Sequence, residues 1–209
     1  GTIYEGLLES ELSIAETDLI VDKEGVYKPA NGTEPHVRSG DVYIHNKSGA
    51  RKASGSYFTK AFAVDHLLDH SLEPALDEHT TMLGTLDEVE AGKAFFDFRV
   101  ADIAMGSGHF LVAAVDRIER RLQQYLAERA LPAVTDELAR LRHSAVTALG
   151  PLADGTDIED ATLLRRQIAR RCIYGVDLNP IAVELARVSL WIHTFVPGLP
   201  LSMLDHHLV

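Results

Sequence analysis

The stretch "VADIAMGSGHFLVAAV", residues 100–115, decides the fold prediction for this chain. A short apolar run typical of a buried strand enters the turn "GSG", and an apolar pattern typical of a helix leaves it. Gly106 and Gly108 carry no Cβ atom, so the backbone can bend sharply and approach a ligand closely. The free N–H groups of the following helix would point at the same place. Taken alone, the turn also fits a tight corner between a strand and a helix.

A second strand ends in an acid and strengthens the prediction. "CIYGVD", residues 172–177, is typical of a short buried strand. In a Rossmann-type sheet, an acid in the place of Asp177 accepts hydrogen bonds from the ribose hydroxyls of a nucleoside. The usual interval is about 20 residues, whereas Asp177 lies 69 residues after Gly108. Two predicted helices, 134–149 and 158–171, explain this interval as an insertion, although an acid at a strand end also fits a helix cap.

The N-terminal part has a different character. Apolar positions at helical spacing predict a helix over residues 1–19. Glycines punctuate short β-type runs between residues 20 and 50, which predicts one or two small hairpins. A further helix is expected from Thr59 to about Ser71, with Pro74 near its end. We therefore expect a helix-and-hairpin section over residues 1–54.

From residue 95 onward, strand and helix patterns alternate, as in a parallel α/β sheet. "KAFFDFRVADIAM", residues 93–105, predicts a strand, and a long amphipathic helix is expected over about 108–130. A last helix follows Asn179-Pro180, a typical helix start. We expect residues 55–209 to form one α/β domain with two inserted helices.

Composition limits the class of protein. Hydrophobic residues make up 46% and charged residues 24% of the 209 positions, as in ordinary globular proteins. No membrane-spanning or signal pattern is found, and the single cysteine, Cys172, predicts a buried thiol, so a cytoplasmic protein without a membrane partner is expected. The net charge of −11 argues against binding a polyanion over the whole surface. A start at Gly1 and an end at "LDHHLV" suggest a piece of a longer protein.

Three stretches together resemble successive motifs of adenine-N6 DNA methyltransferases. They are "RKASGSYFTKAFAVDHLL", "VADIAMGSGHFLVAAVDRI" and "IYGVDLNPIAVELARVSLWI". The family order is G-x-Y-[YF]-T-P, then D-P-A-C-G-S-G-x-F-L, then I-x-G-x-D-x-N-P, which is also the order here. The likeness is greatest to the large enzymes of type IIG restriction–modification and phage-exclusion systems, and "TIYEGLLE" near the start resembles their first helix.

The resemblance implies a binding site for S-adenosylmethionine. The residues that match the family's turn around the methionine moiety are Asp102, Ala104, Gly106, Ser107, Gly108 and the aromatic Phe110. The residues that match the segment closing over the methionine end are Gly55, Tyr57, Phe58 and Thr59. Asp177 matches the acid that holds the ribose hydroxyls, and Leu178 matches the apolar residue that lines the adenine.

The chain departs from the family pattern at several positions. Lys60 stands where the family usually has proline, and Ile103 and Met105 replace proline and cysteine; these two positions could act through the backbone alone. The family's catalytic signature, Asn- or Asp-Pro-Pro followed by an aromatic residue, does not occur in these 209 residues. Asn179-Pro180-Ile181 has a single proline and belongs to the cofactor motif. We therefore expect no catalytic residue in this chain.

The resemblance implies an incomplete class I methyltransferase (Rossmann-like) α/β fold. It also implies an S-adenosylmethionine-binding fragment of a site-specific adenine-N6 DNA methyltransferase from a restriction–modification or phage-defence system. DNA would contact regions outside this fragment, and restriction or defence subunits could be partners. A methyltransferase of RNA or protein, a dinucleotide-dependent oxidoreductase and a non-enzymatic scaffold are the alternatives. The oxidoreductase fingerprint places a glycine where this chain has Leu111, and the intact glycine–aspartate set speaks against a scaffold.

Other residues have simpler interpretations. His66 and His70 have a spacing that could bind zinc, but no third ligand is evident, so an exposed helix face is expected and no metal. The arginines of "RIERRLQQYLAER" and "LLRRQIARR" could contact DNA phosphates, but solvated faces with acid partners one turn away fit better. Trp191 is expected in the core.

Overall fold

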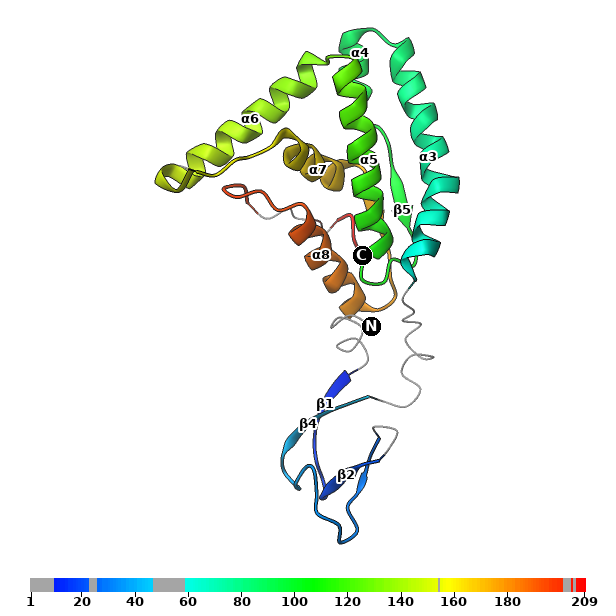
Figure 1. The fold of residues 1–209 in the computed structure, drawn as a ribbon, viewed down its shortest axis with the longest axis vertical. Helices are drawn as coiled ribbons and strands as arrows, with labels where there is room; N and C mark the ends of the chain where they lie inside the picture. Colours follow the sequence, from blue (N-terminus) through cyan, green and yellow to red (C-terminus); the bar gives the residue numbers. More distant parts are fainter. Residues whose placement is uncertain (1–9, 23–25, 47–58, 154, 201–203, 205) are drawn as a thin grey trace. The chain divides into compact units, whose positions relative to one another are not determined.

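The chain forms two compact units, residues 1–58 and 59–209, in the computed structural model (Figure 1). The residues that the structure describes are 10–22, 26–46, 59–153, 155–200, 204 and 206–209. The expected domain boundary between residues 54 and 55 lies outside these described residues, so it stays a prediction. Each unit is treated by itself below.

The described part of the first unit consists of short antiparallel strands. β1 (Ser10–Ile14) pairs with β4 (Val42–Asn46), and β2 (Leu19–Val21) pairs with β3 (Tyr27–Pro29). The β2–β3 pair confirms a hairpin in the expected region. β4, by contrast, pairs with the distant β1 and not with a neighbouring strand.

The helix predicted over residues 1–19 is wrong wherever the structure describes that segment. Leu12 and Ile14 alternate with polar residues, and over so few positions this spacing suits a strand as well as a helix. The distant partner decides between them, since Ser13 Oγ lies 2.8 Å from His45 Nε2 across the β1–β4 pair. A pairing partner 32 residues away cannot be recognised from local periodicity.

The second unit mixes helices with short strands. Its helices are α3 (Ala61–Thr85), α4 (Glu88–Ala94), α5 (His109–Glu128), α6 (Pro132–Leu149), α7 (Asp160–Arg171) and α8 (Pro180–His193), with a 3₁₀ turn at Gly150–Ala153. Its strands are β5 (Val100–Asp102) and β6 (Ile173–Gly175). This confirms the expected mixture of strands and helices, and α5 to α8 lie within a few residues of their predicted bounds. Of the helices in the described parts of the chain, none combines the length and hydropathy needed to cross a membrane.

β5 and β6 form a parallel pair, with Val100 opposite Ile173 and Asp102 opposite Gly175. The end of the chain runs along the other side of β6: Gly175 N–H donates to His207 C=O at 2.7 Å, and Val209 N–H donates to Gly175 C=O at 3.0 Å. The bridge between Gly175 and Leu208 is also parallel. β6 therefore lies between β5 and residues 207–209, and all three segments end at one edge.

α3 is longer than the helix predicted to end near Pro74, which lies inside it. A proline within a helix removes one backbone hydrogen bond. Beyond Pro74, however, Leu76 and Leu83 are fully buried and continue the apolar stripe of Leu68 and Leu72. Their burial, at roughly 1.5–3 kcal/mol for each side chain, outweighs the lost hydrogen bond. The predicted end of this helix was wrong because a single proline was taken to stop it.

The strand predicted over residues 93–105 is correct only at Val100–Asp102. Lys93 and Ala94 instead end α4, which begins after Asp87, where Asp87 Oδ1 accepts the Glu90 N–H at 2.8 Å. Phe95 and Phe96 belong to no strand but fill the core, with exposed fractions of 0% and 2%, which explains the apolar run at these positions. Apolar character without alternation does not separate a strand from a buried turn.

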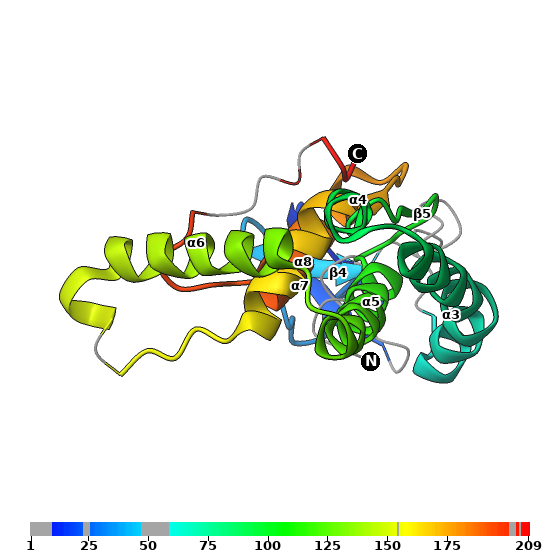
Figure 2. The ribbon, with the colours of Figure 1, turned by 90° about the horizontal axis from the view of Figure 1, so that it is seen from above.

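α5 is the central helix of the second unit and packs against α3, α7 and α8 (Figures 1 and 2). Its buried residues are Leu111, Ala114, Val115, Ile118, Glu119 and Leu122, so one mainly apolar face lies in the core, as in the predicted amphipathic helix. The opposite side pairs with α3: Arg117 contacts Asp65, Asp69 and Glu73, and Arg121 contacts Glu73 and Asp77. The partners of Arg121 lie further along α3 than those of Arg117, so both chains run in the same direction. The two helices are therefore parallel and begin at the same end.

Candidate functional site

The glycine turn connects β5 to α5 and depends on two backbone conformations. Gly106 has φ 52° and Gly108 has φ 82°, in the left-handed region that favours glycine. Gly108 N–H donates to Met105 C=O at 2.8 Å and closes the turn. A Cβ atom on Gly108 would also lie 3.1 Å from the Ala186 Cβ of α8. Glycine is therefore required at this position for conformation and for close packing.

Asp177 joins the two loops that follow β5 and β6. Its Oδ2 accepts the Gly106 N–H at 2.9 Å, and its Oδ1 accepts the Asn179 N–H at 2.8 Å. The side chain is half-buried. Each carboxylate oxygen can accept more than one hydrogen bond, so both retain capacity for a hydroxyl donor. The structure thus brings together the two features on which the sequence prediction depended.

Asp102 stabilises the first half of the turn. Its Oδ1 accepts the Ala104 N–H at 3.0 Å, while its backbone C=O accepts the Val176 N–H at 2.8 Å. Met105 N–H donates in turn to Val176 C=O at 3.1 Å. The two loops are therefore held side by side, with both carboxylates at the carboxyl edge of the parallel pair. This is the edge at which open α/β sheets bind their ligands.

The remaining predicted residues differ in exposure, and some of them lie outside the described residues. Ser107 and Phe110 are half-buried, Ala104 is exposed, and Thr59 is half-buried just before α3. Tyr57 and Phe58, like Gly55, lie outside the described residues, so their predicted contacts stay predictions. Leu178 has an exposed fraction of 101%.

Sequence reasoning missed several apolar side chains that are exposed beside the two carboxylates. Ile103 follows Asp102 directly and is 85% exposed, while Val176 and Ile181 are 45% and 59% exposed. Together with Leu178 they offer an apolar surface around two acceptors. An apolar residue immediately after each strand-end acid is the signal that could have identified Ile103.

Gly175 of β6 allows the turn to pack tightly against the sheet. A Cβ atom there would overlap the Met105 sulfur and would lie 2.9 Å from Leu111 Cδ1. Met105 is buried, with an exposed fraction of 3%. The expectation that position 105 acts through its backbone alone is therefore wrong, because its side chain fills the space above Gly175.

A groove of about 360 Å³ adjoins the site between α3, β5 and α5. Asp102, Ile103 and Phe110 lie at one end, and leucines of α3 form much of the wall. The described residues therefore supply hydrogen-bond acceptors, a close-packed backbone turn and apolar contact surface. This set suits the binding of a molecule with both hydroxyl groups and an aromatic ring.

The other candidate residues have structural roles. His66 and His70 are exposed on α3, and His70 Nδ1 lies 2.8 Å from the His66 C=O. Within the described residues no three potential metal ligands gather. Cys172 is fully buried, as predicted, and burial raises the pKa of its thiol to about 12.

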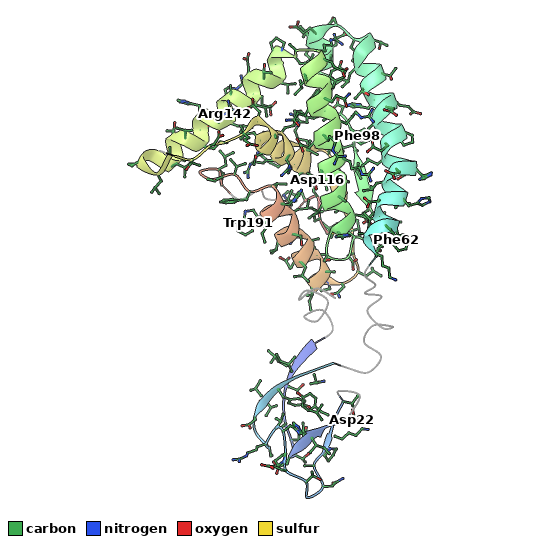
Figure 3. All side chains as sticks on the ribbon, in the orientation of Figure 1. Asp22, Phe62, Phe98, Asp116, Arg142 and Trp191 are labelled. Carbon is green, nitrogen blue, oxygen red and sulfur yellow. The ribbon has the colours of Figure 1, made fainter. Side chains whose placement is uncertain are left out.

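Two structural expectations need correction. Arg117 and Arg121 of α5 pair with acids of the neighbouring helix α3, and not with acids one turn away on their own helix. Arg166 of α7 is 3% exposed and so does not lie on a solvated face; it donates to the Pro200 C=O. Trp191 of α8 is half-buried and contacts Phe195 edge to face, so it is not a core residue (Figure 3).

Comparison with known proteins shows a similarity to a curated protein. Over 171 aligned residues, which cover 68% of this chain, the sequence is 25% identical to a protein of Methanocaldococcus jannaschii named as a type II restriction enzyme and methyltransferase. The match covers only 12% of that protein's length. No protein-family model matches the chain. No solved structure matches it either.

Proposed function

We propose that the second unit binds S-adenosylmethionine as the cofactor-binding part of a methyltransferase of a restriction–modification or phage-defence system. The observation that carries the proposal is the closure of the glycine turn by Asp177, which places a carboxylate with free acceptor capacity beside a sterically tight backbone cradle. The ordered motifs and the name of the M. jannaschii protein support the same conclusion.

The residues fit the chemistry of this cofactor. Asp177 would accept hydrogen bonds from the two ribose hydroxyls, as acids at this position do in Rossmann-type sheets. Leu178 and Ile103 would offer apolar contact to the adenine, which explains why aliphatic side chains are exposed beside two carboxylates. Residues 106–108 would face the methionine moiety, where the absence of Cβ atoms at two positions allows close approach.

When bound, S-adenosylmethionine would supply the methyl group. The part of this chain would be to fix the orientation of the cofactor, which is a proximity effect. The acceptor is proposed to be the N6 amine of adenine in DNA, flipped out of the duplex. The catalytic Asn/Asp-Pro-Pro-aromatic motif, the DNA contacts and any restriction subunit would belong to other parts of the enzyme.

Calorimetry on the protein with S-adenosylmethionine, S-adenosylhomocysteine and NAD⁺ tests the cofactor proposal. We expect saturable binding of the first two and none of NAD⁺. Binding of NAD⁺ alone would favour the oxidoreductase alternative, and binding of none would refute a nucleoside site.

The acceptor is tested with the full-length enzyme and unmethylated duplex DNA. Mass spectrometry of the digested DNA is expected to detect N6-methyladenine. Methylation of RNA or protein in the same assay, with no modified adenine in DNA, would refute the DNA proposal while leaving the cofactor proposal intact.

A further inference from the structure

α8 has two apolar faces, and only one of them is covered in the part of the chain that the structure describes. The inner face packs in the core of the second unit, and its buried residues are Ala182, Val183, Ala186 and Leu190. The outer face also consists mainly of apolar side chains, although it is exposed. A helix that is apolar all round is normally buried on every side. The outer face of α8 therefore has the composition of a contact surface.

The apolar residues of this outer face recur at alternating intervals of four and three positions. We call them the outer stripe: Ile181, Leu185, Val188, Ile192 and Phe195, of which the last follows the C-cap of α8. Leu185 is half-buried, and the other four are 59%, 42%, 57% and 47% exposed, in that order. A mean interval of 3.5 residues is that of the seam between the helices of a coiled coil. The outer stripe therefore matches a second helix, which would cross α8 at about 20°.

The outer stripe is too small to hold a separate molecule stably. It spans about two heptads, whereas a coiled coil is sustained over at least about three. Its half-exposed side chains offer on the order of 300 Å² of apolar surface, and each partner in a stable dimer buries about 800 Å². A helix tethered in the same polypeptide needs less contact, because the linkage raises its effective concentration. The size of the stripe therefore favours a tethered helix over a second copy of the chain.

We propose that the outer stripe receives an amphipathic helix from a part of the full-length polypeptide outside these 209 residues. The apolar residues of that helix would repeat at the same intervals of three and four. The match to the M. jannaschii protein covers 12% of its length, so in that relative most of the chain lies outside the matched region and can supply such a helix. The inference does not depend on which ligand the glycine turn binds.

The position of α8 gives this contact a consequence for the candidate site. Because the inner face of α8 already packs in the core, the added helix would form a layer outside the α/β domain and would belong to another domain. Asn179, the N-cap of α8, donates its N–H to the Asp177 carboxylate at 2.8 Å. A domain held on the outer stripe would therefore be positioned relative to Asp177 through a single helix.

Photo-crosslinking in the full-length enzyme tests the inference. The photoreactive amino acid p-benzoylphenylalanine is incorporated in place of Ile192, within the outer stripe. Val89 of α4 is the matched control, because it is also apolar and is 62% exposed, but lies outside the stripe. Mass spectrometry of the digested enzyme identifies the cross-linked peptides. We expect position 192 to cross-link to one segment outside these 209 residues, with apolar residues at intervals of three and four, in at least about tenfold higher yield than position 89, since only groups in contact react.

Four results would overturn the proposal. A yield at position 192 no higher than at position 89 would show that the stripe is exposed in the full-length enzyme. Cross-links between light and heavy chains in a mixture of isotope-labelled and unlabelled enzyme would show a second copy on the stripe. Cross-links to another part of these 209 residues, or to a segment without the apolar repeat, would also contradict it. If the variant at Ile192 does not fold, the same measurement at Val188 decides.

Discussion

Replacing Asp177 with alanine tests both roles of this carboxylate, in the stability of the loops and in ligand binding. In the structure it accepts backbone N–H groups from Gly106 and Asn179 and so joins the loops after β5 and β6. In the proposed complex it would also accept the ribose hydroxyls. Alanine removes both sets of hydrogen bonds, so binding and stability must be measured separately.

The magnitude follows from the number of bonds to a charged acceptor. Each such bond is worth about 1.5–3 kcal/mol, and about 1.4 kcal/mol corresponds to a tenfold change in Kd. Loss of a single ribose bond therefore predicts an affinity for S-adenosylmethionine weakened by roughly 10- to 150-fold. Loss of the loop closure predicts a decrease of about 1–3 kcal/mol in the free energy of unfolding.

Asp87→Ala is the matched control. Asp87 also accepts a backbone N–H, at 2.8 Å from Glu90, but it lies at the start of α4 and outside the candidate site. We expect this variant to lose about 1 kcal/mol of stability with unchanged affinity. Calorimetry and urea unfolding of both variants are the assays. Equal affinities of wild type and Asp177→Ala, at a temperature where both are folded, would refute the ribose assignment.

Three other substitutions have expected outcomes that the structure explains. Gly108→Ala should destabilise the fold by about 1–3 kcal/mol in urea unfolding, because it adds a Cβ at φ 82° beside Ala186; an unchanged midpoint would contradict this. Leu178→Ser should leave unfolding unchanged, since Leu178 is 101% exposed, but weaken S-adenosylmethionine binding severalfold in calorimetry; unaltered affinity would exclude an adenine contact. Arg117 lowers the pKa of Asp69 below 3.8, so folding favours the ionised carboxylate. Arg117→Gln should therefore destabilise the protein at neutral pH, and its urea midpoint should approach that of wild type as the pH falls through the Asp69 pKa; a pH-independent difference would refute this.

The elements that the sequence predicted correctly are those with strong local signals. α8 begins at Asn179-Pro180, and Asn179 Oδ1 accepts the Ile181 N–H at 3.0 Å as a capping residue does. α5 follows the glycine turn because its apolar residues recur at helical spacing. These features depend on residues within one or two turns of each other, so the sequence alone is sufficient to find them.

The features that the sequence could not predict depend on distant partners. β1 is a strand because of β4, and α3 passes through Pro74 because its leucines pack on α5. The closure of the site joins Asp177 to Gly106 across 71 positions, and no local pattern specifies that its carboxylate accepts this particular N–H. The exposure of Ile103 depends on how the loops after β5 and β6 pack together, which no local sequence pattern specifies.

The most direct test of the account is an NMR measurement of S-adenosylmethionine bound to the protein with methyl-labelled leucine and isoleucine. The account predicts nuclear Overhauser effects from the adenine ring protons to the methyl groups of Leu178, and from the ribose protons to residues beside Asp177. Leu178→Ser provides the assignment. Contacts of the adenine ring with methyl groups remote from this edge, or the absence of any contact from saturated protein, would contradict the central claim.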